Sequence, residues 1–181
     1  MKDKAEQEQV SHGKMLAECK NILESNGAPA ILSGSALLGA YRDGDLVPWC
    51  YGAVLSSYKN NLQKNEDKII SDLKNSGFKI ARHYTGDNYK IRVDKGKFNI
   101  EIVGYIKNKK YFFRQLNDKK KIISKKFLLP PFGEIQLRGE TYKTPADIEG
   151  FLEFIYQDWK TPTRSMSPST YKNREHMRIE K

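Results

Sequence analysis

The segment that decides the fold of this chain runs from Ser33 to Leu55 and reads SGSALLGAYRDGDLVPWCYGAVL. Its Gly-Ser pair, Gly34-Ser35, follows the short apolar run at 30–32 and precedes the mostly apolar residues 36–41. This order predicts a short strand, a tight turn and then a short helix. The sequence Asp43-Gly44-Asp45 predicts a turn that ends this helix and leads the chain toward the next strand.

Apolar periodicity predicts the secondary structure of the remaining chain. Three helices are expected: one at 5–25, one at 61–75, and one that Thr144 caps and Pro145 begins. Alternating apolar and polar residues predict strands at 49–56, 78–84, 89–94 and 98–103. Residues 127–139 are expected to contain a further hairpin, and residues 107–110 a polar loop or turn.

Composition limits the class of protein. The chain has 181 residues, of which 38% are hydrophobic, and this predicts one domain with a moderate core. We expect residues 1–164 to form the domain and residues 165–181 to form a polar C-terminal tail. No apolar run approaches the roughly 20 residues of a membrane span, and the first residues lack the apolar core of a signal peptide. With only Cys19 and Cys50, the expected setting is the reducing cytoplasm.

The net charge of +10 has two interpretations, a lysine-rich solvated surface or attraction to polyanions. Lysines cluster at 107–110 and 119–126. Because no helix-turn-helix, zinc-knuckle or RNP-like signature accompanies them, nucleic-acid binding would rest on charge alone and is not expected. The sequence pattern does not indicate an oligomeric state.

Two motifs resemble the LicD/fukutin-related family, whose members have the nucleotidyltransferase fold. The segment at 33–55 is similar to the family's Gly-Thr-Leu-Leu-Gly-Ala-x-Arg turn, which is followed by Pro-Trp and alternating aspartates. The family's ending is matched by Phe132-Gly133, by Pro145-Ala146-Asp147 and by Tyr156-Gln157-Asp158-Trp159. The resemblance covers roughly residues 30–162 and implies an α/β (α+β) fold, a nucleotidyltransferase-like mixed sheet flanked by helices.

The resemblance also implies a divalent metal, Mg²⁺ or Mn²⁺, held by an acidic row on one strand. Residues at i and i+2 of a strand point to the same face, so alternating aspartates converge on a cation and on substrate phosphates. The corresponding residues of this chain are Cys50, Gly52 and Val54, none of which is a hard oxygen ligand. Glu101 matches a third family carboxylate on a later strand. If a metal is bound, we predict Asp45 and Glu101 as its ligands and as the catalytic carboxylates. The alternatives are ordinary turn chemistry for Asp45 and an outward-facing strand position for Glu101.

Three residues are predicted to bind substrate. Gly34 and Ser35 open a short helix whose backbone N–H groups could hold a phosphate, and the alternative is a strand-to-helix turn with nothing bound. Arg42 matches the family's arginine and could neutralise a diphosphate through paired hydrogen bonds. Its alternative role is that of a helix-end cation favoured by the helix dipole.

Three functional hypotheses follow. The first is a transferase that moves a phospho-alcohol or phospho-sugar group, of the phosphocholine or ribitol phosphate type, from a CDP-linked donor to a glycan acceptor. The second is a catalytically impaired pseudoenzyme or binding module that keeps the nucleotide pocket without the metal site. The third is a basic protein that binds polyanions. The resemblance favours the first hypothesis, and the replacement of the family's aspartates by Cys50, Gly52 and Val54 favours the second. Whether the chain is an enzyme stays open at this point.

Overall fold

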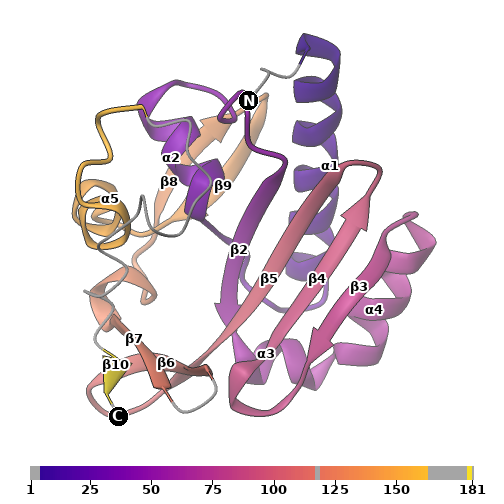
Figure 1. Ribbon diagram of the computed structural model, residues 1–181. Helices are drawn as coiled ribbons and strands as arrows, with labels where there is room; N and C mark the ends of the chain where they lie inside the picture. The colour runs from indigo at the N-terminus through magenta and orange to yellow at the C-terminus, as the bar shows by residue number, and fades with distance from the viewer. Residues whose placement is uncertain (1–4, 117–118, 163–178, 181) are drawn as a thin grey trace.

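The computed structural model describes residues 5–116, 119–162 and 179–180 (Figure 1). Its longest helix, α1 (Glu6–Ser25), buries one stripe that includes Leu16, Cys19 and Leu23. The helix ends at Asn26, and Gly27 takes a positive φ of 74° that lets the chain turn back. The predicted helix at 5–25 is therefore confirmed.

The strands of the described residues join into one mixed sheet (Figure 1). Its central strands are β1 (Ile31–Ser33), β2 (Gly52–Tyr58) and β5 (Phe98–Lys107), and the edge on one side is formed by β3 (Lys79–Tyr84) and β4 (Lys90–Lys95). β2 and β5 run parallel, whereas β1–β2, β4–β5 and β3–β4 are antiparallel. The strands predicted around 49–56, 78–84, 89–94 and 98–103 are all present.

The other strands extend the sheet at its two ends. One extension contains the hairpin of β6 (Tyr111–Leu116) and β7 (Lys119–Ser124), with β10 (Ile179–Glu180) paired to β7. The other contains the hairpin of β8 (Gly133–Leu137) and β9 (Glu140–Thr144). Of the predicted tail, residues 165–178 and 181 lie outside the described residues.

Helices cover both faces of this sheet. On one face the buried strand residues Phe98, Ile100 and Ile102 lie beneath α1 and α4 (Glu66–Asn75), since His12 of α1 stacks on Phe98 at 4.4 Å. α3 (Lys59–Lys64) follows β2 directly. On the opposite face lie α2 (Gly34–Arg42) and α5 (Ile148–Tyr156), and Figure 1 shows α2 in front of the strands and α1 behind them. The expected α/β fold with a mixed sheet between helices is confirmed. No helix among the described residues is long and apolar enough to cross a bilayer.

Two helix predictions were wrong in detail. The helix predicted at 61–75 is two helices, because Asn65 leaves helical geometry and its amide donates to the carbonyl oxygen of Asn26 at 2.9 Å. The cap predicted at Thr144 lies instead at Asp147, whose carboxylate accepts from the Gly150 N–H at 2.8 Å. Thr144 is the last residue of β9, where its partner is Gly133, so it is not available to start a helix.

Two strand regions also differ from the prediction. The hairpin expected within 127–139 lies later in the chain, as β8 and β9, and its turn is at Arg138-Gly139. Residues 107–110 were expected to be a loop, and the chain does turn at 108–110. The β6–β7 hairpin that follows had no counterpart in the prediction. The lysines of this hairpin interrupt the alternation of apolar and polar residues that predicts a strand. Phe112 and Ile123 are nevertheless buried opposite each other.

Gly39 shows how tightly α2 is fitted to the loop that leads to β2. A Cβ on Gly39 would collide with the carbonyl oxygen of Asp45 and would lie 2.7 Å from the Val47 nitrogen, and both atoms belong to the backbone. We predict that Gly39→Ala lowers the free energy of unfolding by about 3 kcal/mol, measured by urea denaturation, because backbone cannot move aside as a side chain does.

Gly44→Ala is the matched control. Gly44 has a positive φ of 73°, but a Cβ at this position would have no neighbour within 4 Å, so its substitution should cost only about 1–2 kcal/mol. Equal losses for the two variants would show that α2 and the loop are not in close contact.

Candidate functional site

The start of α2 is pressed against β2. Gly34 adopts a φ of +63°, and a Cβ at this position would lie 3.0 Å from Cγ2 of Val54 and 3.9 Å from the Tyr156 hydroxyl. Only glycine combines that φ with so close an approach. Tyr156 belongs to the motif at the end of the domain, so the two motifs that resemble the family meet at one place in the fold.

The residue before this glycine does not cap the helix. Ser33 occupies the N-cap position, but its hydroxyl lies 2.8 Å from the Ser56 hydroxyl and 3.3 Å from the Ile31 carbonyl oxygen. The first-turn N–H groups of α2 therefore receive no side-chain cap from Ser33. Such groups, with the positive end of the helix dipole, favour a nearby anion.

Ser35 and Cys50 are joined in a short hydrogen-bond chain. The Ser35 hydroxyl donates to the Gly52 carbonyl oxygen at 3.0 Å, and the Cys50 thiol donates to the Ser35 oxygen at 3.2 Å. The structure thus brings together Gly34, Ser35, Cys50, Gly52 and Val54, which the sequence motif assigns to phosphate binding or to the degenerate metal positions.

Glu101 lies beside this group on the neighbouring strand. In the parallel pairing of β2 with β5, Val54 is the partner of Glu101, and Gly52 is the partner of Asn99. Glu101 consequently points to the face of the sheet that carries α2, away from α1. Its carboxylate accepts a hydrogen bond from Lys90 on β4 at 2.9 Å, and both side chains are largely shielded.

Asp45 is placed elsewhere. Its carboxylate is held by the Arg138 guanidinium, with an Nε–Oδ1 distance of 2.6 Å, and Arg138 also pairs with Glu6 on α1. The hydrogen bonds from Arg138 hold the pKa of the Glu6 carboxyl below its ordinary value. Because Arg138 packs on the α1 side of the molecule, against Gly13, the structure does not bring Asp45 and Glu101 together as a pair of ligands.

Arg42 is at the far end of α2 from Ser35, about 10 Å along the helix axis. Its Nε and one terminal nitrogen donate to the neighbouring Asp43 carboxylate, and the other terminal nitrogen donates to the Trp159 carbonyl oxygen at 3.2 Å. These contacts tie the end of α2 to the chain after α5. They match the helix-end role better than the diphosphate-binding role.

The family's metal requires oxygen ligands that this site does not supply. Positions 50, 52 and 54 carry a thiol, no side chain and an isopropyl group, and the remaining carboxylate, Glu101, is already paired with an ammonium group. At Gly52 an added Cβ would lie 2.9 Å from Oδ1 of Asn99, whose amide donates to the Tyr51 carbonyl oxygen. Within the described ranges no three His, Cys, Asp or Glu side chains gather as a metal site. The residues present do not fit a divalent cation.

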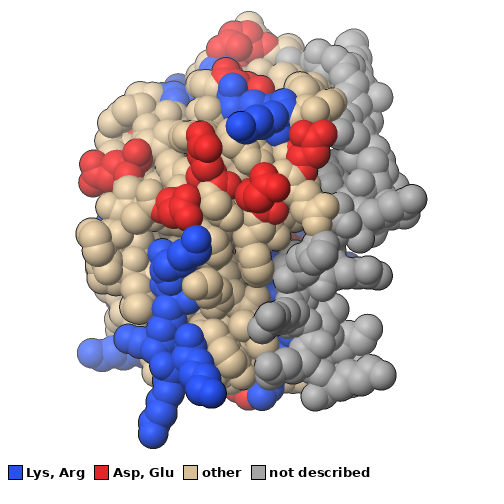
Figure 2. Space-filling view, turned by 90° about the vertical axis from the view of Figure 1, so that its left-hand side faces the viewer, with Lys and Arg blue, Asp and Glu red and all other residues tan. Residues whose placement is uncertain are grey.

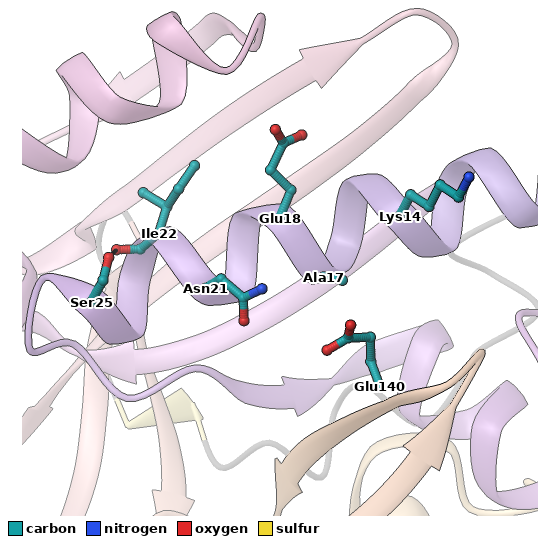
Figure 3. A pocket seen from close by; sticks show the side chains of 7 residues that line it. All are labelled: Lys14, Ala17, Glu18, Asn21, Ile22, Ser25 and Glu140. Carbon is teal, nitrogen blue, oxygen red and sulfur yellow. Dashed lines mark hydrogen bonds between the residues drawn. The ribbon is translucent and has the colours of Figure 1, made fainter.

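A groove on the other side of the molecule has a different character. It runs along α1 between Lys14 and Ser25 and is closed on one side by Glu140 (Figure 3). Its acidic side chains are already paired, Glu18 with Lys95 and Glu140 with Lys20. None of the residues that converge on α2 lines it, so we do not assign the functional site there.

Lysines are also concentrated on the β6–β7 hairpin. In Figure 2 basic side chains gather at the level of this hairpin, whereas acidic side chains lie above them at the level of α5. Lys126 bridges the two groups through an ion pair with Asp147 at 2.9 Å. This distribution accounts for part of the positive net charge and is separate from the residues around Gly34.

Two residues of the site were missed from the sequence, Lys90 and Asn99. Lys90 could have been found from the predicted turn at 95–97, because this turn pairs Arg92 with Glu101. Lys90 lies two residues before Arg92 and therefore faces the same side of the sheet as Glu101. The signal for Asn99 was its position two residues before Glu101, which gives both side chains one direction. Tyr156 was recognised in the ending motif, where packing and helix termination were the favoured explanation and a substrate contact the alternative.

Comparisons with known proteins agree with this geometry. No curated protein sequence matches the chain. The solution structure of the antibiotic-resistance factor ANT(2'')-Ia is similar with a TM-score of 0.57 and 9% identity, over 93% of this chain and 83% of that one. The crystal structure of ANT(2'')-Ia in complex with adenylyl-2''-tobramycin gives a TM-score of 0.56 and 8% identity, over 92% and 87%. At such low identity these similarities establish the nucleotidyltransferase-like fold alone.

The family itself is shown by sequence. The family model described as LicD/FKTN/FKRP, nucleotidyltransferase domain, matches residues 27–147, which include the start of α2, strand β2 and Glu101. Two independent lines, one from sequence and one from fold, thus agree on the same architecture. This chain belongs to the LicD/FKTN/FKRP nucleotidyltransferase-domain family.

Proposed function

We propose that this chain is a LicD-type domain that binds a CDP-linked donor of a phospho-alcohol group, without the metal-dependent transfer of the family. The observation that carries the proposal is the contrast within one site. The glycine turn against Val54 is kept, whereas positions 50, 52 and 54 offer no hard ligand and Glu101 is paired with Lys90. Membership of the family supports a nucleotide donor as the ligand class.

Transfer to a glycan acceptor is the second candidate. Family membership and the retained Glu101 favour it, since a carboxylate on this strand is the residue that the resemblance assigns to catalysis. Phosphoryl transfer depends mainly on positioning and on neutralising charge over the phosphate oxygens. A basic site could supply part of that charge, so lost metal ligands alone do not decide between binding and turnover.

Calorimetry separates the two candidates. We predict that CDP-choline or CDP-ribitol binds the chain equally well with Mg²⁺, with Mn²⁺ and with a chelator, and that no CMP is released over hours. Gly34→Val should weaken this binding at least tenfold, because its side chain would collide with Val54. The matched control, Gly44→Val, lies in a turn with open space around it and should bind as the unchanged chain does.

Metal-dependent binding with release of CMP would favour the transferase instead. Salt-sensitive binding to random DNA, without any response to nucleotides, would favour the polyanion hypothesis. Absence of nucleotide binding under all conditions would contradict both of the first two candidates.

Substitutions at positions 50, 52 and 54 test directly whether these positions correspond to the family's metal ligands. We predict that Cys50→Asp, Gly52→Asp and Val54→Asp together give only weak Mn²⁺ binding, because the Asn99 amide occupies the space next to position 52. Adding Asn99→Ser should increase the affinity several-fold by making room for the new carboxylate. Titration calorimetry with Mn²⁺ measures both steps.

The same positions changed to asparagine are the control for this series. They keep the size of the new side chains and remove the charge, so they should bind no Mn²⁺. If the four-residue variant also shows no gain over the unchanged chain, the assignment of 50, 52 and 54 as the former metal positions is wrong.

A further inference from the structure

The ion pair between Lys90 and Glu101 is the central charged contact on the α2 side of the sheet. Lys90 Nζ lies 2.9 Å from Oε1 of Glu101, with 17% of the Lys90 side chain and 33% of the Glu101 side chain exposed. The ammonium group also lies 5.6 Å from the centre of the Tyr84 ring. A shielded carboxylate on one side and an aromatic face on the other therefore hold this cation in place.

The register of the strands brings further cations to the same face. Arg92 is the direct partner of Glu101 across β4 and β5, and Arg82 is the partner of Arg92 across β3 and β4. Arg92 Nε donates to Asp94 at 3.0 Å. Because paired residues of antiparallel strands point to one side, Arg82, Lys90 and Arg92 face the side on which Glu101 and Val54 lie. Three cations thus accompany two carboxylates there.

A divalent cation and the Lys90 ammonium compete for the same carboxylate. Magnesium ions need several oxygen ligands in near-octahedral geometry. The other carboxylate on this face, Asp94, is paired with Arg92, and positions 50, 52 and 54 supply no oxygen side chain. The Lys90 ammonium group has three N–H donors, and one of them donates a hydrogen bond to the Glu101 carboxylate. The other two can donate to phosphate oxygens, for which lysine acts as a point charge.

We propose that Lys90 is the cation of this site, and that it binds the diphosphate group of a nucleotide ligand in place of the family's metal. The inference rests on the proposed function, because it names the residue that would neutralise the donor. Glu101 then holds Lys90 in position and is not a metal ligand. Arg92, its neighbour across the strands, adds a second positive charge near the same place.

This assignment makes Lys90 and Glu101 substitutions act in opposite directions. With inorganic pyrophosphate and CDP as probes, in the presence of a chelator, Lys90→Met should weaken binding at least tenfold. Glu101→Gln keeps an oxygen that accepts from Lys90 and removes a negative charge, so it should bind both probes as tightly as the unchanged chain or more tightly. If Glu101 were a metal ligand, Glu101→Gln would instead abolish binding, and the chelator would abolish it in the unchanged chain.

A double variant separates the loss of the cation from the exposure of Glu101. In Lys90→Met alone, the unpaired carboxylate repels the anion as well. Lys90→Met with Glu101→Gln removes both charges, and we expect it to remain at least fivefold weaker than the unchanged chain. Recovery of full affinity in the double variant would show that Lys90 only masks Glu101, and it would overturn the proposal.

Control variants exclude a general loss of charge or of fold. Lys97 lies on the turn between β4 and β5 with 78% of its side chain exposed, so Lys97→Met removes the same charge outside the site and should leave both affinities unchanged. Lys90→Arg should keep most of the binding. Thermal unfolding of each variant identifies any loss of folded protein, and binding per folded molecule is then compared.

The outcomes distinguish this inference from the proposed function. If the unchanged chain binds the probes and Lys90→Met does not weaken that binding, only the role of Lys90 is overturned. The proposed nucleotide binding then stands. No binding of either probe by the unchanged chain overturns both. The proposal is supported if the chain binds the probes in the presence of the chelator, if Lys90→Met weakens this binding, and if Glu101→Gln retains it.

Discussion

The parallel pairing of β2 with β5 is the constraint on which the candidate site depends. It fixes Val54 beside Glu101 and Gly52 beside Asn99, and it gives these side chains a common face. A shift of one residue would turn all of them toward α1 and α4, where Ala53, Leu55, Ile100 and Ile102 are buried. The apolar core on one face therefore determines which polar residues can meet on the other, and the site is a consequence of the register of the core.

The glycines of the first motif have the same origin in close packing. Gly34 permits the start of α2 to touch Val54, and Gly39 permits the loop at 45–47 to cross the helix. Both glycines are required by steric contacts whether or not a ligand is bound. This explains how the glycines of the motif can be present without its aspartates, since the packing of the fold alone requires these glycines.

Much of the fold could be predicted from the sequence because the spacing of apolar residues along the chain follows which side chains are buried. The helix at 5–25 and the strands around 89–94 and 98–103 follow that pattern and are confirmed. The pattern failed where a polar side chain made a distant contact, as at Asn65, which breaks a helix by binding the carbonyl oxygen of Asn26. It also failed in β6 and β7, where lysines surround the buried residues Phe112 and Ile123.

The candidate site was predictable in part, because motifs and strand alternation are visible in the sequence. Motifs and alternation identified Gly34, Ser35 and Glu101, but they could not reveal that Asp45 is held by Arg138, 93 residues away along the chain.

The contacts around position 52 and around Glu101 explain why the residues present do not fit a divalent cation. The absence of a side chain at Gly52 makes room for the Asn99 amide, and that amide bonds to the Tyr51 carbonyl oxygen and completes the packing. Without a cation beside it, Glu101 would be a shielded negative charge, and the Lys90 ammonium group compensates that charge directly. Both features leave the sheet well packed, with the Glu101 carboxylate paired. Metal binding at this place would therefore require several neighbouring residues to change together, because an aspartate at position 52 would meet the Asn99 amide and Glu101 is already paired with Lys90.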